Sequence, residues 1–273
     1  MDIPELDHFA LSLEAGVARI AFDRPAHANA LDAPMWTAMR SAFEWADRYD
    51  PVRVVVLAAH GKHFCAGIDL SLLASVPRRI GHADAARAQE KLRHMIADMQ
   101  DCVSAIERCR KPVIAAIQGA CIGGGVDIVT ACDMRYANAN ARFAVREIDM
   151  AMAADIGTLQ RLPRLVPEGI ARELAFTGRE IGAEEAARIG LLNRVFESGE
   201  ALTEGVGEVA RCIAAKSPLA VRGTKAVLNH GRDHSIEDGL AFVANWNASA
   251  LLSRDMQLAA EAIGAGRAPA FDD

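Results

Sequence analysis

Two buried strands, each followed by a glycine-containing turn and a helical stretch, constrain the fold of this chain more than any other feature. The continuous apolar runs at residues 53–59 (RVVVLAA) and 113–117 (VIAAI) predict strands that are covered on both faces. The turns that follow them, within residues 60–75 and 118–133, lead into predicted helices. We interpret this strand, turn and helix unit as a structural repeat within an α/β fold.

Hydrophobic periodicity predicts the other elements. Short strands are expected at residues 17–22, 134–137 and 142–145. Helices are expected from about Asp32 and over residues 86–109, where apolar residues recur on one face. Beyond about Thr158 the pattern is mostly helical, and residues 236–263 form an amphipathic helical tail that can cover its own core or a neighbouring subunit.

The length, charge and cysteine content of the chain limit the kinds of function that it can have. The 273 residues are enough for one large domain, alone or with an appendage. A net charge of −6 argues against nucleic-acid and anionic-membrane partners. The six cysteines include no CxxC pair, so we expect buried free thiols and no metal site.

The ends of the sequence and its hydropathy predict a soluble cytoplasmic protein. The acidic start MDIPELDHFALSLEAG lacks the basic residues and apolar run of a signal peptide. No stretch approaches the roughly 18 apolar residues of a membrane span. The final APAFDD is not a peroxisomal address.

Three carboxylates lie in an otherwise apolar segment, EIDMAMAADIGTLQRLP, at residues 147–163. They are Glu147, Asp149 and Asp155. Removing a carboxylate from water costs several kcal/mol unless it is paired or its pKa shifts. These acids are therefore structural ion pairs or working acids and bases.

A glycine-rich turn at residues 123–125 precedes these acids and carries its own, Asp127. The turn is not a phosphate-binding GxGxxG, because residue 128 is Ile, and it lacks the Lys-Ser/Thr of a P-loop. Tight packing of strand against helix would explain the glycines alone. A second turn, AGIDL at residues 66–70, favours another interpretation, in which one N–H from each turn forms an oxyanion hole.

At this point the chain resembles the crotonase (enoyl-CoA hydratase/isomerase) superfamily. The segments that carry the resemblance are DRPAHANAL, HFCAGIDL, GACIGGGVDIVTACD and the REIDM to GTLQRLP block, which together cover essentially the whole chain. The resemblance implies a spiral of repeated ββα units over residues 1–200 and a helical trimerisation region over residues 201–273. It also implies an acyl-CoA thioester substrate, no cofactor beyond the CoA of that substrate, and a homotrimer or homohexamer.

The resemblance also implies a set of site residues. The backbone N–H groups of Ile68 and Gly124 would form the oxyanion hole. Asp127 and Glu147 fall where hydratases place two catalytic glutamates, but Asp127 is the shorter acid, which argues against ordinary addition of water. Substrate contacts would come from Ala28, Ala66, Gly67, Ile68, Asp69, Leu70 and Gly124.

Asp155 narrows the resemblance, because it stands where many hydratases have glycine. The acids Asp127, Glu147 and Asp155 together are most similar to the Δ3,5-Δ2,4-dienoyl-CoA isomerase group, which implies a role in β-oxidation of fatty acids. Such an isomerase moves a proton between two distant carbons, so one acid at each end is the simplest arrangement. We expect Glu147 to act as base at the α-carbon and Asp155 as acid at the distal carbon, with Asp149 structural.

Two alternatives stay open at this level. One is an enoyl-CoA hydratase of the same fold, which would not need Asp155. The other is a non-catalytic crotonase-fold protein that binds RNA or a partner, since fold alone does not guarantee chemistry. Retention of all three acids and the lack of a basic stripe argue against that second alternative.

Overall fold

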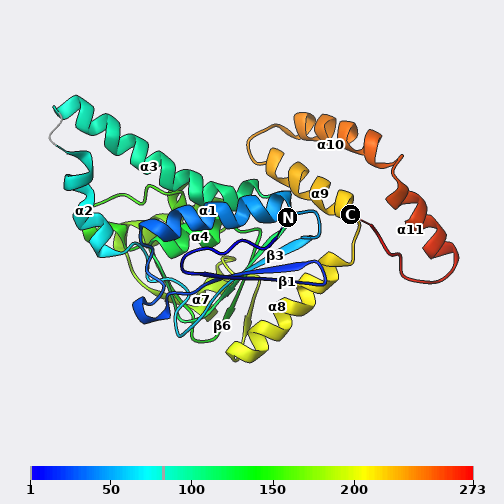
Figure 1. Ribbon diagram of the computed structural model, residues 1–273, viewed down its shortest axis with the longest axis horizontal. Coiled ribbons are helices and arrows are strands. Elements are labelled where there is room, and N and C mark those ends of the chain that lie inside the picture. Colours follow the sequence, from blue (N-terminus) through cyan, green and yellow to red (C-terminus); the bar gives the residue numbers. More distant parts are fainter. Residues whose placement is uncertain (1, 82–83, 273) are drawn as a thin grey trace.

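A six-stranded sheet forms the centre of the protein, whose computed structural model describes residues 2–81 and 84–272 (Figure 1). Its strands are β1 (Phe9–Glu14), β2 (Val17–Phe22), β3 (Val54–Ala59), β4 (Val113–Ile117), β6 (Met134–Asn138) and β9 (Arg194–Phe196), in the order β1-β2-β3-β4-β6-β9. The β1–β2 pair is antiparallel and the following pairs are parallel. The carboxyl ends of the parallel strands therefore share one edge of the sheet, where ligands bind in open α/β sheets.

A second, smaller sheet runs beside that edge. It consists of β5 (Ala120–Ile122), β7 (Arg142–Ala144) and β8 (Ile181–Gly182), in the order β5-β7-β8. An isolated bridge between Cys65 and Cys121 places the segment at residues 65–68 alongside β5. A second bridge, between Leu31 and Ile68, places Leu31 next to that segment. Each turn of the chain thus contributes a strand to the large sheet, a short segment to the small sheet, and then a helix. This arrangement agrees with the repeated ββα unit expected from the sequence.

Helices cover both faces of the large sheet (Figure 1). One face carries α1 (Ala33–Arg48), α3 (Ala85–Arg108) and α4 (Gly124–Ala131), and the other carries α8 (Gly199–Ala214). Helix α2 (Leu70–Ile80) lies beyond the edge of the sheet. In β3, Val55 and Leu57 belong to the core under the first set, whereas Val54 and Val56 pack toward α8. Burial on both faces explains why this strand is continuously apolar.

The C-terminal helices extend away from the sheet (Figure 1). They are α9 (Pro218–His230), α10 (Ile236–Ala250) and α11 (Arg254–Gly264). The predicted tail over residues 236–263 is therefore two helices, because the chain turns at 251–253 and Ser253 caps α11 with its side chain. The predicted division at residue 200 remains a prediction.

Shorter elements connect the main ones. They are the 3₁₀ turns η1 (Pro25–His27), η2 (Glu147–Met150) and η3 (Leu162–Arg164), and the helices α5 (Thr158–Arg161), α6 (Glu168–Thr177) and α7 (Ala183–Arg188).

The structure corrects several details of the sequence-based expectations. Strands β1, β5, β8 and β9 were not predicted, and β5, β8 and β9 are too short to show a pattern of their own. Ala15 and Gly16, both with positive φ, make the tight turn between β1 and β2. Five cysteines are buried as expected, but Cys212 is exposed. Within the described residues, no helix is both long and apolar enough to cross a membrane.

Candidate active site

Two backbone amides from different turns lie side by side beyond the edge of the large sheet. Gly124 is the first residue of α4, so its N–H has no acceptor inside the helix. A Cβ added to Gly124 would lie 3.8 Å from the backbone nitrogen of Ile68. Leu31 accepts from Asp69 and donates to Gly67, which holds the Ile68 turn in place. In the described part of the chain neither amide has a recorded acceptor, so both are available to one carbonyl oxygen.

Two glycines permit this close approach. Gly67 has a φ of +95°, and a Cβ there would lie 3.0 Å from the carbonyl oxygen of Ile122. Gly123 has a φ of +52°, and a Cβ there would lie 3.1 Å from Oε1 of Glu147. A larger residue at either position would strain the backbone and displace its neighbour. The Glu147 carboxylate therefore lies directly against the turn that supplies the Gly124 amide.

Asp127 is buried in the first turn of α4, with a relative exposure of 1%. Its Oδ1 accepts a hydrogen bond of 2.6 Å from the backbone N–H of Thr158, at the start of α5. Burial raises the pKa of Asp127 to about 6, and the hydrogen bonds from Thr158 oppose that rise. Asp127 thus fastens the segment that follows Asp155 to the glycine-rich turn. Its predicted place among the catalytic acids stays a prediction.

Glu147 is the first residue of η2 and is half-buried. Its Oε2 is buried and has no hydrogen-bond partner among the described residues. Burial is the main cause that raises the pKa of Glu147 to about 7, and the nearby charges of Asp127 and Asp155 add to it. A carboxyl group that exchanges its proton near neutral pH suits general acid–base catalysis.

Asp155 lies close enough to influence the other two acids. Its charge raises the pKa of both Asp127 and Glu147. The residue as a whole is exposed, yet partial burial of its carboxyl group raises its own pKa. Gln100 on α3 donates a hydrogen bond of 2.6 Å to its backbone oxygen. The structure therefore brings together the three acids that the sequence singled out.

An ion-pair cluster supports the loop that carries Asp155. The guanidinium of Arg161 donates to Glu107 at 3.0 Å and to Ser104 at 3.2 Å, both on α3. Gly157 has a φ of +133°, and a Cβ there would overlap Nη1 of Arg161. These contacts fix residues 155–158 against α3.

Asp149, the remaining acid of the segment at residues 147–163, has the structural role that was expected. Its carboxylate accepts a hydrogen bond of 2.8 Å from Arg146 on the surface. It contributes to none of the shifts that raise the pKa of the other acids.

Ala28, predicted to contact the substrate, and its neighbour Asn29 both have the left-handed conformation. The carbonyl oxygen of Ala28 accepts a hydrogen bond of 3.0 Å from Ala66. Leu70 is 65% exposed and can contact a ligand. The Asp69 side chain, in contrast, caps α2. Hydrogen bonds from the Ser71 hydroxyl and the Ser71 backbone N–H, and then the pairing with Arg24 at 2.8 Å, lower its pKa to about 2. A ligand at Asp69 would therefore meet its backbone.

Asn29 was missed by sequence reasoning. It is fully buried, and its Nδ2 donates to the carbonyl oxygens of His60 at 3.0 Å and His63 at 2.8 Å. Its Oδ1 accepts from the backbone N–H of Arg24. Asn29 thereby fastens the first loop to the turn that leads to Ile68. A short polar side chain that tolerates positive φ was the only signal in the sequence.

A cavity of about 320 Å³ opens beside Ile68, between α1, α2 and α3. Its lining is largely apolar and includes Trp36, Leu72, Leu73, Val76, Met95 and Met99. Such a lining suits an aliphatic chain more than a charged group. The cavity lies next to the Ile68 amide. An acyl chain whose carbonyl oxygen accepts from that amide could therefore extend into the cavity.

Comparison with known proteins agrees with this geometry. The family model described as enoyl-CoA hydratase/isomerase matches residues 12–268. The chain is 46% identical to the peroxisomal Δ3,5-Δ2,4-dienoyl-CoA isomerase of Arabidopsis thaliana, over 94% of this chain and 93% of that protein. It is 44% identical to the mitochondrial enzyme of that name from Homo sapiens, over 90% and 75% of the two chains. A crystal structure of enoyl-CoA hydratase from Bacillus anthracis superposes with a TM-score of 0.88 at 30% identity, over 97% and 99%.

These comparisons confirm the predicted fold and correct the predicted location. The cytoplasmic expectation is wrong: the related isomerases are peroxisomal or mitochondrial proteins. That expectation had used the absence of recognisable targeting signals, which is weak evidence. The match over almost the whole sequence and the agreement in fold establish that the chain belongs to the enoyl-CoA hydratase/isomerase family.

Proposed function

We propose that this protein is a Δ3,5-Δ2,4-dienoyl-CoA isomerase of fatty-acid β-oxidation. The observation that carries the proposal is the pair of carboxyl groups, Glu147 and Asp155, which interact electrostatically beside two free backbone amides. Two relatives at 46% and 44% identity bear that name. A hydratase needs to activate water, whereas an isomerase needs proton transfer at two separate carbons, and Asp155 supplies the second group.

The proposed reaction is a proton transfer along a conjugated system. Glu147 removes a proton from the α-carbon of the 3,5-dienoyl thioester, and the electron pair forms a dienolate. The N–H groups of Ile68 and Gly124 stabilise the negative charge on the thioester oxygen. Asp155 then donates a proton to the distal carbon, which gives the 2,4-dienoyl thioester. Atoms and electrons balance without a redox partner, so no cofactor beyond the CoA of the substrate is needed.

Substrate binding would use the two turns and the apolar cavity. The acyl chain would enter the cavity beside Ile68, and the CoA portion would lie along the first loop. The proposed contacts are Ala28, Ala66, Gly67, Ile68, Asp69 (through its backbone), Leu70 and Gly124. A bound acyl chain that covers Asp155 would exclude water from its carboxyl group. Loss of water favours the protonated carboxyl group, which is the form that can donate a proton to the substrate.

Incubation with a 3,5-dienoyl-CoA and a 2-enoyl-CoA, side by side, tests the proposed activity. Absorbance of the conjugated 2,4-dienoyl thioester should grow with the first substrate, while the second should be hydrated far more slowly. Rapid hydration of the 2-enoyl-CoA without isomerisation of the diene would instead identify a hydratase.

The pH dependence should report the paired carboxyl groups. Turnover needs one ionised and one protonated carboxyl, so Glu147 and Asp155 must together hold one proton. Because the pKa of Glu147 is about 7, kcat/KM should fall about tenfold per unit as pH rises above that value, where both groups are ionised. Initial rates from pH 5 to 9 measure this limb. An activity that keeps rising to pH 9 would contradict the shared-proton mechanism.

We also propose that the protein is a homotrimer or homohexamer assembled through its C-terminal helices. These helices expose large apolar side chains, including Leu228 at 66%, Ile236 at 84% and Ile263 at 75%. Such exposure on adjoining helices is typical of an interface. Light scattering should give three or six times the chain mass of 29.2 kDa, and a monomer would contradict the assignment.

A further inference from the structure

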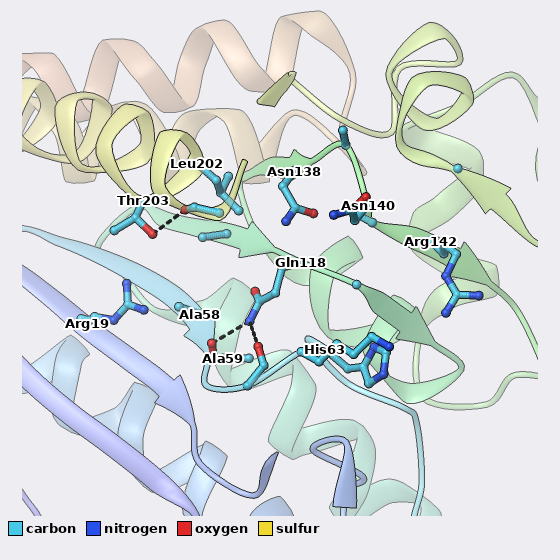
Figure 2. Close-up of a pocket in the computed structure, with 18 residues that line it drawn as sticks. Arg19, Ala58, Ala59, His63, Gln118, Asn138, Asn140, Arg142, Leu202 and Thr203 are labelled. Carbon is cyan, nitrogen blue, oxygen red and sulfur yellow. Dashed lines mark hydrogen bonds between the residues drawn. The ribbon is translucent and has the colours of Figure 1, made fainter. Parts of the chain in front are cut away.

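A cavity of about 740 Å³ lies on the α8 side of the large sheet, and the described residues that line it include none of the three acids (Figure 2). Its polar groups do not converge on one point. Arg19 and His63 lie at opposite ends of the cavity (Figure 2). The side-chain amide of Gln118 already donates to the carbonyl oxygens of Ala59 at 2.7 Å and Gly61 at 3.3 Å. This cavity therefore does not define a ligand.

Another cavity, of about 560 Å³, lies beside α3 and differs because Asp155 lines it. Gln100, Ser104 and Glu107 of α3 form one of its walls, and their i, i+4, i+7 spacing places them on one face of the helix. Gln100 donates to the backbone oxygen of Asp155 at 2.6 Å, whereas Ser104 and Glu107 accept from Arg161. Helix α3 thus presents a polar face to residues 155–161, which we call the Asp155 loop.

Arg161 folds back over the start of its own helix. A Cβ added to Gly157 would overlap Nη1 of Arg161, so the guanidinium lies against a residue two positions after Asp155. The same guanidinium donates to Oε2 of Glu107 from Nε at 3.2 Å and from Nη2 at 3.0 Å. The two side chains are only 15% and 27% exposed, so salt screens this pair less than a fully exposed one. Arg161 thereby ties the Asp155 loop to α3.

Glu107 also binds the C-terminal part of the chain. Its Oε1 accepts from Nη1 of Arg232, in the turn between α9 and α10. Arg164 fastens the same turn to η3, because it donates to the backbone oxygen of Arg232 at 3.2 Å and to Asp233 at 2.8 Å. Each oxygen of the Glu107 carboxylate therefore holds one arginine, the first on the Asp155 loop and the second on this turn.

Glu147 is held by a different turn. A Cβ added to Gly123 would lie 3.1 Å from its Oε1, and its backbone oxygen accepts from the N–H of Met152 at 3.1 Å. A shift of the Asp155 loop would therefore displace the proposed distal acid and leave the proposed α-carbon base in place.

We propose that Arg161, Glu107 and Arg232 are positioning residues, which hold the Asp155 loop so that its carboxyl group reaches the distal carbon of the substrate. The turn between α9 and α10 then affects the second proton transfer and not the first. A displacement of about 1 Å near a reacting group can cost about 10²-fold in rate, so a loosened loop is enough to slow reprotonation of the dienolate. This inference rests on the proposed function, with Asp155 as the distal acid.

The fate of the dienolate in D₂O tests the proposal in the full-length protein. The dienolate either returns to substrate, with deuterium at the α-carbon, or continues to product. In Glu107→Gln and in Arg232→Gln, kcat for isomerisation should fall about tenfold or more. The ratio of deuterated substrate to product, measured by mass spectrometry, should rise by the same factor. An unfolded variant forms no dienolate and so cannot produce this rise. A ratio in Glu107→Gln equal to that of the natural protein would overturn the proposal.

Glu168→Gln is the matched control, because it makes the same chemical change in an exposed pair with Arg172 on α6. Its rate and its ratio should be those of the natural protein. The double variant Glu107→Gln/Arg232→Gln should lose no more activity than Glu107→Gln alone, because both residues act through one carboxylate. Additive losses would overturn the link between Arg232 and the Asp155 loop.

The same assays distinguish failure of this inference from failure of the proposed function. A natural protein that forms no 2,4-dienoyl product would refute both together. An active natural protein whose Glu107→Gln and Arg232→Gln variants keep its rate and its ratio would refute the positioning role alone.

Discussion

Replacement of Asp155 with asparagine is expected to lower kcat for dienoyl-CoA isomerisation by about 10³-fold, within the range for loss of a general acid. Asparagine keeps the shape of the side chain but has no carboxylic acid proton to transfer. The hydrogen bond from Gln100 reaches the backbone oxygen of residue 155, so the loop should keep its position. Stopped assays that follow the conjugated product, with circular dichroism to check folding, measure the effect.

Asp149→Asn is the matched control for this substitution. It makes the same chemical change six residues earlier, but it removes only an exposed ion pair with Arg146. Exposed pairs contribute about 0–1 kcal/mol, so kcat and stability should change little. An Asp155→Asn protein with the full isomerisation rate would contradict the proposed function, whatever the control shows.

The features that could be predicted from the sequence are local. The run at residues 54–59 is apolar because both faces of β3 are buried, and the glycines at 67 and 123 have the positive φ angles that their turns require. The order of these local motifs along the chain then matched that of a known family. Together they predicted the α/β architecture and the grouping of Asp127, Glu147 and Asp155.

The features that could not be predicted depend on contacts between distant residues. Gln100 reaches Asp155 across 55 positions, and Asn29 reaches His63 across 34. No periodicity reports such pairs, because each is created by the fold. The role of Asp127 shows the same limit. Its carboxylate accepts a hydrogen bond from the Thr158 amide on a loop 31 positions away.

Unpaired groups, finally, became visible only from the three-dimensional contacts. Arg19 is one of 25 arginines in the sequence, and its local sequence does not set it apart from the others. Its isolation in a cavity depends on the sheet that covers it. Glu147 Oε2 and Asn138 Oδ1 are further examples, because both oxygen atoms are buried and neither has a hydrogen-bond partner among the described residues.

Replacement of Glu147 with glutamine is expected to abolish exchange of the substrate α-proton with solvent, and to lower kcat by about 10³-fold as a result. Glutamine fits the space against Gly123 but cannot accept a proton, so the dienolate does not form. In D₂O, the natural protein should introduce deuterium at the distal carbon of the product. It should also introduce deuterium at the α-carbon of recovered substrate whenever the dienolate is reprotonated there by Glu147.

The same exchange experiment on Asp155→Asn separates the roles of the two acids. If Asp155 acts only at the distal carbon, this variant still forms the dienolate at Glu147 and returns a proton to the α-carbon. Deuterium should therefore accumulate in unconverted substrate, as measured by mass spectrometry, although isomerisation is lost. Removal of the Asp155 charge should also lower the pKa of Glu147, because that charge helps to raise it. The opposite result, exchange in Glu147→Gln and none in Asp155→Asn, would show that the two acids have exchanged roles.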